Sequence, residues 1–270
     1  MMKTTQTIRL HWNGRDRNIE YQWVGVQDSA APLMIFLHEG LGSVAHWQHW
    51  PEQLCQVLGY RGLVYSRYAY GNSSPRPSDE IWQGDYLHIE AQQALPALLQ
   101  ALGIDQPFSL FGHSDGGTIA LLYAALPTSL AQDIIVLAPH IYIEAQSTQS
   151  VQKAIHWYQH GDLKQRLARY HADVDSAFWG WATVWGDESY QKTWNIERDI
   201  QTIRCPILAI QGTEDEYASL DQIHIIQRHL PQQTTLCVLE HCRHTPYIDA
   251  PEAVTKAVQD FLAERRCRTS

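Results

Sequence analysis

A serine between two closely spaced glycines is the first group in this sequence that could act as a nucleophile. Ser114 lies in Gly112-His113-Ser114-Asp115-Gly116, which matches the pattern G-x-S-x-G. In this pattern the serine sits on a tight strand-to-helix turn with strained backbone angles, and larger side chains two residues away would collide. We therefore predict that Ser114 is a nucleophile. A glycine-rich turn with an incidental serine is the alternative.

A serine nucleophile needs a histidine base and an acid that orients the histidine, and two later loops offer both. The first loop contains Glu214, Asp215 and Glu216. We choose Asp215, because a short and rigid carboxylate fixes the imidazole tautomer well. The second loop contains His241 and His244, and the residue types alone leave both open as the base.

The loop HEGLGS at residues 38–43 is the candidate for stabilising a developing oxyanion. Two preorganised N–H donors are each worth about 2.7–4 kcal/mol of transition-state stabilisation. We assign one donor to the backbone of Asp115 and the other to Gly40, where the backbone must approach the substrate closely, with Leu41 as the alternative. Leu41 and His113 are also predicted to contact the substrate.

A metal site is a weaker interpretation of the same region. Cys237, His241, Cys242 and His244 are close in sequence, but Cys237 lies inside a predicted strand and the spacing fits no common zinc pattern. We predict no metal and no cofactor, because a serine, a histidine and an aspartate need neither for acyl transfer.

Short apolar runs that alternate with helical patterns predict the elements that must position these residues. The predicted strands are 7–12, 18–24, 32–37, 63–66, 108–111, 134–137, 207–210 and 236–239, and the predicted helices are 46–58, 86–102, 118–126, 220–230 and 251–262. Asn13-Gly14 is a hairpin signal between the first two strands. A hairpin followed by alternating strands and helices predicts a mostly parallel, eight-stranded sheet with helices on both faces.

One stretch breaks this alternation. Residues 141–204 contain no buried-strand run, but they show helical spacing and hold five of the ten tryptophans. Because a structureless loop of this length is implausible in a compact domain, we predict a helical cap inserted after the sixth strand. Most of the tryptophans should join the cap to the main domain. One or two of Trp179, Trp181 and Trp185 should face an apolar substrate pocket.

Composition limits the function classes. The formal net charge is −9 and no basic run occurs, which argues against binding to nucleic acid or acidic membranes. The N-terminus has no apolar stretch of signal-peptide length, and no segment is long and apolar enough to span a bilayer. We expect a cytoplasmic protein that acts on a small-molecule ester, as a monomer or a homodimer.

Taken together, the motifs resemble those of the α/β-hydrolase superfamily over nearly the whole chain. The matching segments are HEGLGS at His38, YSRYAYGNSS at Tyr65, GHSDGG at Gly112, QGTEDEY at Gln211 and HCRHTP at His241. The resemblance implies an α/β-hydrolase core of residues 1–140 and 205–270 with the cap at 141–204. It also selects His244 as the base, because this histidine precedes Thr-Pro as in the family.

The sequence departs from the family pattern at three positions. Glu39 replaces the usual glycine of the oxyanion loop, and Ser66 and Ala69 replace an aspartate and a glycine. The first change puts a carboxylate near the predicted site, and the sequence gives it no role.

Within the superfamily the chain is similar to small capped bacterial enzymes, and a serine nucleophile argues against epoxide hydrolases and haloalkane dehalogenases, which use aspartate. Carbon–carbon hydrolases of meta-cleavage products usually carry Asn before the serine and Trp after the histidine, where this chain has His113 and Thr245. The resemblance therefore favours a serine esterase for small acyl or aromatic substrates, acting through an acyl-enzyme on Ser114. A carbon–carbon hydrolase or enol-lactonase is the alternative, and a ligand-binding receptor of the same fold is the non-enzymatic one.

Overall fold

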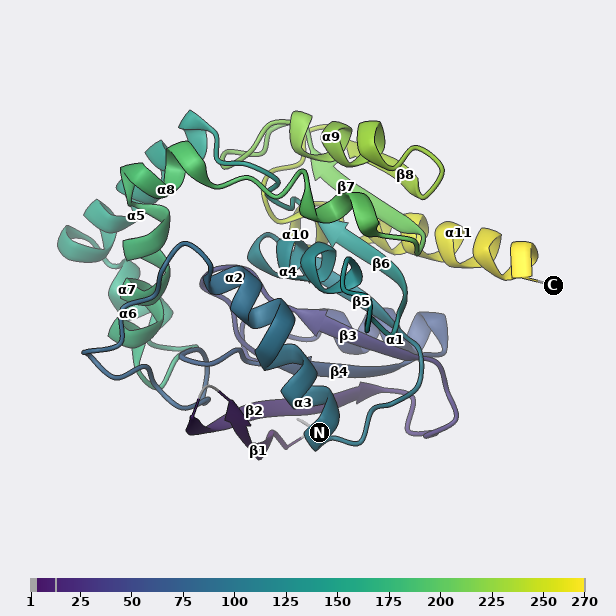
Figure 1. The fold of residues 1–270 in the computed structure, drawn as a ribbon, viewed down its shortest axis with the longest axis horizontal. Coiled ribbons are helices and arrows are strands. Elements are labelled where there is room, and N and C mark those ends of the chain that lie inside the picture. Colours follow the sequence, from purple (N-terminus) through teal and green to yellow (C-terminus); the bar gives the residue numbers. More distant parts are fainter. Residues whose placement is uncertain (1–3, 13, 270) are drawn as a thin grey trace.

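The computed structural model describes residues 4–12 and 14–269 and contains an eight-stranded sheet (Figure 1). The strands are β1 (Gln6–Trp12), β2 (Arg15–Gly25), β3 (Leu33–Leu37), β4 (Arg61–Tyr65), β5 (Phe108–His113), β6 (Ala131–Leu137), β7 (Ile207–Gly212) and β8 (Thr234–Leu239). Their spatial order is β1-β2-β4-β3-β5-β6-β7-β8. β2 is antiparallel to β1 and β4, and the other neighbours are parallel. The predicted α/β-hydrolase fold is confirmed.

Helices cover both faces of the sheet, so the central strands are apolar and buried. The covering helices are α1 (Trp50–Leu58), α2 (Tyr86–Ile89), α3 (Leu95–Ala101), α4 (Asp115–Ala124), α9 (Asp221–His229), α10 (Pro246–Asp249) and α11 (Pro251–Thr269). On β3, Met34 and Phe36 join the apolar cluster of α1 and α11, whereas Ile35 and Leu37 join that of α3, α4 and α9. None of the described helices has both the length and the apolar character needed to cross a lipid bilayer.

Two predicted elements differ in detail. The helix predicted at 86–102 is interrupted by a π-helical turn at Glu90–Ala94, between α2 and α3. Pro96, at the second residue of α3, lacks an N–H and clashes with a regular preceding turn, which explains the wider turn there. At the predicted hairpin, Asn13 lies outside the described residues, and Gly14 has a φ of 68°, a backbone conformation that favours glycine.

The stretch between β6 and β7 is helical. It consists of α5 (Ala145–His160), α6 (Leu163–Leu167), α7 (Val174–Trp185), α8 (Glu188–Thr193) and a 3-10 turn at Asp199–Thr202. Helices α5 to α8 gather at one end of the molecule, in teal and green (Figure 1). Aromatic rings pack them together; for example, the rings of Tyr158 and Phe178 stack with their centroids 3.7 Å apart. The division of the chain into a core domain and a cap stays a prediction.

Candidate active site

Ser114 occupies the turn between β5 and α4, with φ 53° and ψ −117°. This positive φ is strained for a residue with a Cβ atom. A Cβ on Gly112 would lie 2.2 Å from the carbonyl oxygen of Gly116, and a Cβ on Gly116 would lie 2.0 Å from that of Leu37. Both distances are far below van der Waals contact, so the turn that lifts Ser114 above the sheet requires glycine at both positions.

The structure brings Ser114, His244 and Asp215 into one chain of hydrogen bonds. His244 Nε2 lies 3.0 Å from Ser114 Oγ, and its Nδ1 lies 2.8 and 3.0 Å from the two carboxylate oxygens of Asp215. Asp215 follows β7 and His244 follows β8. The two loops approach so closely that a Cβ on Gly212 would lie 2.0 Å from the carbonyl oxygen of Cys242. This geometry lets the imidazole accept the hydroxyl proton while the carboxylate fixes its Nδ1–H tautomer.

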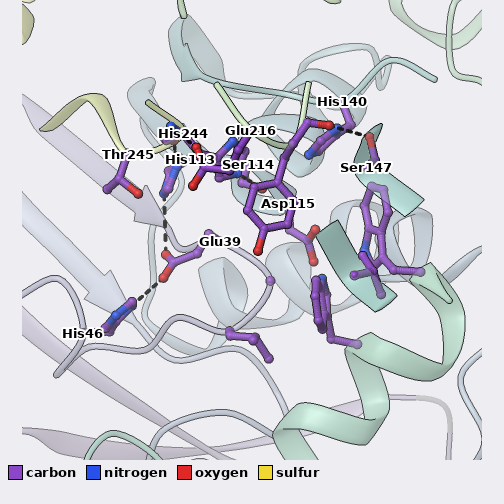
Figure 2. Close-up of a pocket in the computed structure, with 16 residues that line it drawn as sticks. Glu39, His46, His113, Ser114, Asp115, His140, Ser147, Glu216, His244 and Thr245 are labelled. Atoms are coloured by element: carbon purple, nitrogen blue, oxygen red, sulfur yellow. Dashed lines mark hydrogen bonds and ion pairs between the residues drawn. The ribbon is translucent and has the colours of Figure 1, made fainter. Parts of the chain in front are cut away.

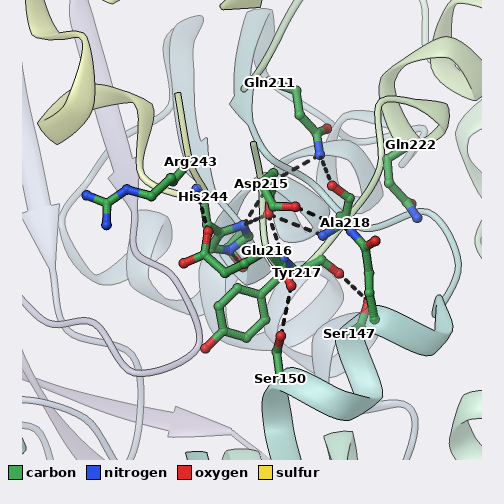
Figure 3. A network of polar contacts seen from close by, with 12 residues as sticks. Ser147, Ser150, Gln211, Asp215, Glu216, Tyr217, Ala218, Gln222, Arg243 and His244 are labelled. Atoms are coloured by element: carbon green, nitrogen blue, oxygen red, sulfur yellow. Dashed lines mark hydrogen bonds and ion pairs between the residues drawn. The ribbon is translucent and has the colours of Figure 1, made fainter. Parts of the chain in front are cut away.

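Asp215 is held by further donors (Figure 3). It accepts hydrogen bonds from the backbone N–H of Tyr217 at 2.8 Å, the N–H of Ala218 at 3.2 Å and Nε2 of Gln211 at 3.1 Å. Burial by itself would raise the pKa of Asp215, but His244 and the Tyr217 N–H hold it below its ordinary value. Burial by itself would lower the pKa of His244, but Asp215 raises it above the ordinary value. The two side chains therefore stabilise each other's charged forms.

The competing residues of the two loops lie elsewhere. Glu214 and His241 form an exposed pair, with His241 Nδ1 2.9 Å from Glu214 Oε1. Glu216 accepts a hydrogen bond from the backbone N–H of His244 at 3.1 Å, so it contacts the main chain of that residue. Asp215 is the acid that meets the imidazole ring.

A cavity of about 270 Å³ opens beside Ser114 (Figure 2). Trp181 and Trp185 line it, since they are four residues apart on α7 and share one face of that helix. Trp179 does not line this cavity, because its position on the helix turns it away. Its ring packs edge-on against Tyr158 and Phe178. A contact of Trp179 with the substrate stays a prediction that this cavity does not support.

The loop at residues 38–43 forms another part of the cavity wall. Gly40, Leu41 and Asp115 line the cavity there. A Cβ on Gly40 would lie 2.4 Å from Nε1 of Trp181, so the close approach of α7 requires glycine at this position. The carbonyl oxygen of Leu41 accepts a hydrogen bond from Nε2 of His171 at 2.9 Å, which fixes the loop. The roles of Gly40 and Asp115 as oxyanion donors stay predictions.

Glu39 places a carboxylate in the wall of the cavity. Its Oε1 forms a close hydrogen bond with Nδ1 of His46, and its Oε2 lies 3.7 Å from Nδ1 of His113 (Figure 2). Burial by itself would raise the pKa of Glu39, but the adjacent His46 holds it well below its ordinary range. Burial by itself would lower the pKa of His46, but Glu39 raises it. In the sequence, only the unusual residue at position 39 indicates the pair of Glu39 and His46.

His113, predicted to contact substrate, also supports the base. It lines the cavity, and its Nε2 donates a hydrogen bond to the carbonyl oxygen of His244 at 2.7 Å. The residue before Ser114 thus fixes the main chain of His244, the residue predicted to deprotonate Ser114.

A glutamate from β2 compensates for one departure from the family pattern, the serine at position 66. Ser66 Oγ donates to Glu20 Oε2 at 2.7 Å, and the same carboxylate accepts hydrogen bonds from the backbone and side chain of Asn72. Glu20 thus brings a carboxylate to the side chain of residue 66, the position at which the family usually has an aspartate. Ala69, in place of the usual glycine, adopts a φ of 77°. No local pattern in the sequence marks Glu20.

The side chain of Asp115 lies beneath the nucleophile turn in a buried network. Its Oδ2 accepts a hydrogen bond from the hydroxyl of Tyr86 at 2.7 Å and from Arg67 at 3.3 Å. Burial raises the pKa of Asp115, and Arg67 opposes this shift. Nε1 of Trp185 donates to the Tyr86 hydroxyl at 2.6 Å, which connects α7 to the nucleophile turn.

His140 also lines the cavity. Burial and the nearby charge of His244 lower the pKa of His140 to about 3, so its ring is neutral near pH 7. In the part of the chain that the structure describes, no group of three His, Cys, Asp or Glu side chains is arranged to hold a metal ion.

Comparison with known proteins identifies the family. The model of the alpha/beta hydrolase family matches residues 34–257, and the chain belongs to this family. Among curated proteins, it is 22% identical to Epoxide hydrolase 3 of Xenopus tropicalis over 93% of this chain and 76% of that protein. It is 25% identical to the human serine hydrolase BPHL over 72% of this chain and 66% of that protein.

Solved structures agree on the fold. A structure from a study of carboxylesterases of Nitrososphaera gargenis superposes with a TM-score of 0.75 at 18% identity, covering 95% of this chain and 98% of the other. A thermophilic esterase from Thermogutta terrifontis gives a TM-score of 0.73 at 16% identity, covering 96% and 98%. The family and the fold make this protein a hydrolase, and its relatives differ in their substrates.

Proposed function

We propose that this hydrolase cleaves carboxylic esters of small acyl or aromatic groups through an acyl-enzyme on Ser114. The observation that carries the proposal is the hydrogen-bonded chain from Ser114 through His244 to Asp215 at the wall of the cavity. A hydroxyl nucleophile with a histidine base is the arrangement of acyl transfer. The resemblance to an epoxide hydrolase is confined to sequence and family, because this chain has a serine at the nucleophile position.

In the proposed reaction, Ser114 Oγ forms a bond to the ester carbonyl carbon while its proton passes to His244 Nε2. The N–H groups of Gly40 and Asp115 hold the oxyanion. When the intermediate collapses, the bond to the alkoxy oxygen breaks and His244 gives its proton to the leaving alcohol. Water then attacks the acyl carbon, its proton passes through His244 to Ser114 Oγ, and the free acid leaves.

The cavity supports the proposed substrate size. Its volume of about 270 Å³ suits a compact acyl or aromatic group, and Trp181 and Trp185 supply flat apolar contacts. We further propose that residues 141–204 act as a cap, because α5 and α7 of this stretch supply cavity residues such as Val151 and Trp181.

Ser114→Ala tests the proposal. The variant should fold normally, since it removes only a hydroxyl, but it should lose turnover of short-chain activated esters and lose labelling by a fluorophosphonate probe. The wild-type protein should cleave these esters and react with the probe. Near-wild-type turnover by the variant would assign the nucleophile elsewhere, and a wild type that neither turns over esters nor reacts with the probe would favour a ligand-binding protein of the same fold.

A further inference from the structure

The cavity beside Ser114 has an uneven charge distribution. Glu39, Asp115 and Glu216 are among the residues that line it, while no arginine or lysine does so among the residues that the structure describes. Asp115 is paired with the buried Arg67, 3.3 Å away. Glu39 has only histidines beside it, and its lowered pKa keeps it ionised near pH 7. An anionic substrate group would therefore meet a carboxylate and find no permanent cation.

A gap between two hydrogen-bond acceptors lies next to this carboxylate. His113 Nε2 donates to the carbonyl oxygen of His244, so in the neutral ring Nδ1 is an acceptor. His113 is 1% exposed, and this Nδ1 is buried without a hydrogen-bond partner. It faces Glu39 Oε2 at 3.7 Å, which is too long for a hydrogen bond. Two facing acceptors call for a donor that can bond to both.

We propose that Glu39 and His113 bind an ammonium group of the substrate, so that the ester cleaved by this protein carries a protonated amine. This inference rests on the proposed function. An ammonium has several N–H donors, and a position beside the gap puts both acceptors within hydrogen-bonding distance.

Two other features favour the same ligand. Trp181, Trp185 and Tyr217 line the cavity, and aromatic rings attract a cation that lies over their faces. The net charge of −9 on the whole chain favours the approach of a cation over that of an anion.

Three esters that share one ring test the inference. They are methyl benzoates that carry an aminomethyl, an ethyl or a carboxymethyl group at the para position, so that a cation, a neutral group and an anion are compared on one rigid ring. The first measurement is binding to the Ser114→Ala variant by calorimetry, because this protein retains the cavity without cleaving the ester. The aminomethyl ester should bind roughly tenfold tighter or more than the ethyl ester, and the carboxymethyl ester should bind weakest.

Adding Glu39→Gln to Ser114→Ala should remove most of the preference for the aminomethyl ester over the ethyl ester. The matched control is Glu252→Gln, which changes the net charge equally at an exposed position at the start of α11 and should leave the preference intact. Thermal unfolding checks that each variant is folded. If the aminomethyl ester binds Ser114→Ala no tighter than the ethyl ester, the inference is overturned, whatever the outcome with Glu39→Gln.

Turnover by the wild type separates this inference from the proposed function. Cleavage of the three esters, with kcat/KM highest for the aminomethyl ester, supports both. Preferential binding of the aminomethyl ester without cleavage of any ester overturns the esterase proposal and leaves the ammonium site standing. Cleavage with no preference in binding or turnover overturns only the ammonium site.

Discussion

Two loops of the cavity wall each carry a carboxylate that contacts Nδ1 of a histidine, but they hold it differently. In the acid loop, residues 213–219, Asp215 accepts bonds from two backbone N–H groups and Gln211 besides His244. In the oxyanion loop, residues 38–43, Glu39 has one close bond to His46 and an oxygen facing His113 across 3.7 Å. A carboxylate whose oxygens already accept several hydrogen bonds is suited to orienting a base. A carboxylate with an oxygen that still lacks a donor is suited to receiving a ligand.

Both loops are anchored by the helical stretch between β6 and β7. Ser147 and Ser150 of α5 donate to the carbonyl oxygens of Tyr217 and Glu216 in the acid loop, at 2.6 and 2.8 Å (Figure 3). On the oxyanion loop, His171 alone donates to the carbonyl of Leu41 among the bonds that the structure describes. The comparison thus predicts that the contact between the oxyanion loop and this helical stretch depends more on a single side chain.

Asp215→Asn should have the largest effect, because an amide cannot hold the imidazole in the same tautomer. We expect kcat for an activated ester to fall on the order of 10⁴-fold, as for aspartates with this role in serine proteases. The matched control is Glu214→Gln in the same loop, whose exposed pair with His241 should make it nearly neutral, within about twofold. A larger loss from Glu214→Gln than from Asp215→Asn would move the acid to position 214.

His171→Leu should have the next largest effect. It removes the donor to the Leu41 carbonyl and the acceptor for the N–H of Gly71, so the oxyanion loop loses its bond to the stretch between α6 and α7 and keeps its bonds to Arg67. Since small displacements of positioned groups cost up to about 10²-fold in rate, we expect kcat to fall by roughly tenfold to a hundredfold with KM changed less. His156→Leu, at an exposed position of α5, is the control. A purely structural role would lower the melting temperature and leave kcat unchanged.

The contrast between the loops also shows what sequence could predict. Ser114, Asp215 and His244 each follow their own strand, and parallel strands bring their carboxyl ends to one edge, so motif and strand order together locate them. The partners of Glu39 are different. His113 ends the strand next to the one that precedes Glu39, and His46 is seven residues further along the chain, but no motif pairs these residue types with a glutamate at position 39. Glu20, which compensates for Ser66, is missed for the same reason.

The tryptophans show a limit of another kind. Composition marks the segment that contains Trp179, Trp181 and Trp185 as apolar, but it does not say which side faces the cavity. The helical period does separate them, because residues 181 and 185 share a face and residue 179 lies on another. Where the helix begins must be known before that period can be applied, and Asp173, which accepts a hydrogen bond from Ser176 N–H, sets this start.

Ser147→Ala and Ser150→Ala compare two anchors of the acid loop that lie one helical turn apart. Ser147 is 1% exposed and its bond to the Tyr217 carbonyl is partly buried, so its loss should cost about 1–3 kcal/mol of unfolding free energy. Ser150 bonds at an exposed site, where water replaces the hydroxyl, so its loss should cost no more than about 0.5 kcal/mol. Urea denaturation of both variants measures the difference. Equal losses would mean that the Ser147 bond contributes no more unfolding free energy than the exposed Ser150 bond.

The smallest expected effect tests whether the two loops are electrostatically coupled. Burial by itself would lower the pKa of His244, but Asp215 raises it, followed by Glu216 and then Glu39. The rate should therefore rise with pH as His244 loses its proton, with a midpoint in kcat/KM above the ordinary histidine value of about 6.5. Removing a nearby negative charge makes the imidazolium less stable, so His244 loses its proton at a lower pH.

Both Glu216→Gln and Glu39→Gln should consequently shift the acidic limb of the profile to lower pH. The shift from Glu39→Gln should be the smaller one, because His113 lies between Glu39 and His244: its Nδ1 is 3.7 Å from Glu39 Oε2 and its ring is centred 5.2 Å from that of His244. Profiles measured with a neutral ester at fixed ionic strength avoid any change in substrate charge, and Glu252→Gln controls for net charge. If Glu39→Gln and Glu252→Gln gave the same midpoint, the carboxylate of the oxyanion loop would not influence His244. It would then act on the substrate alone, and the two loops would be electrostatically independent.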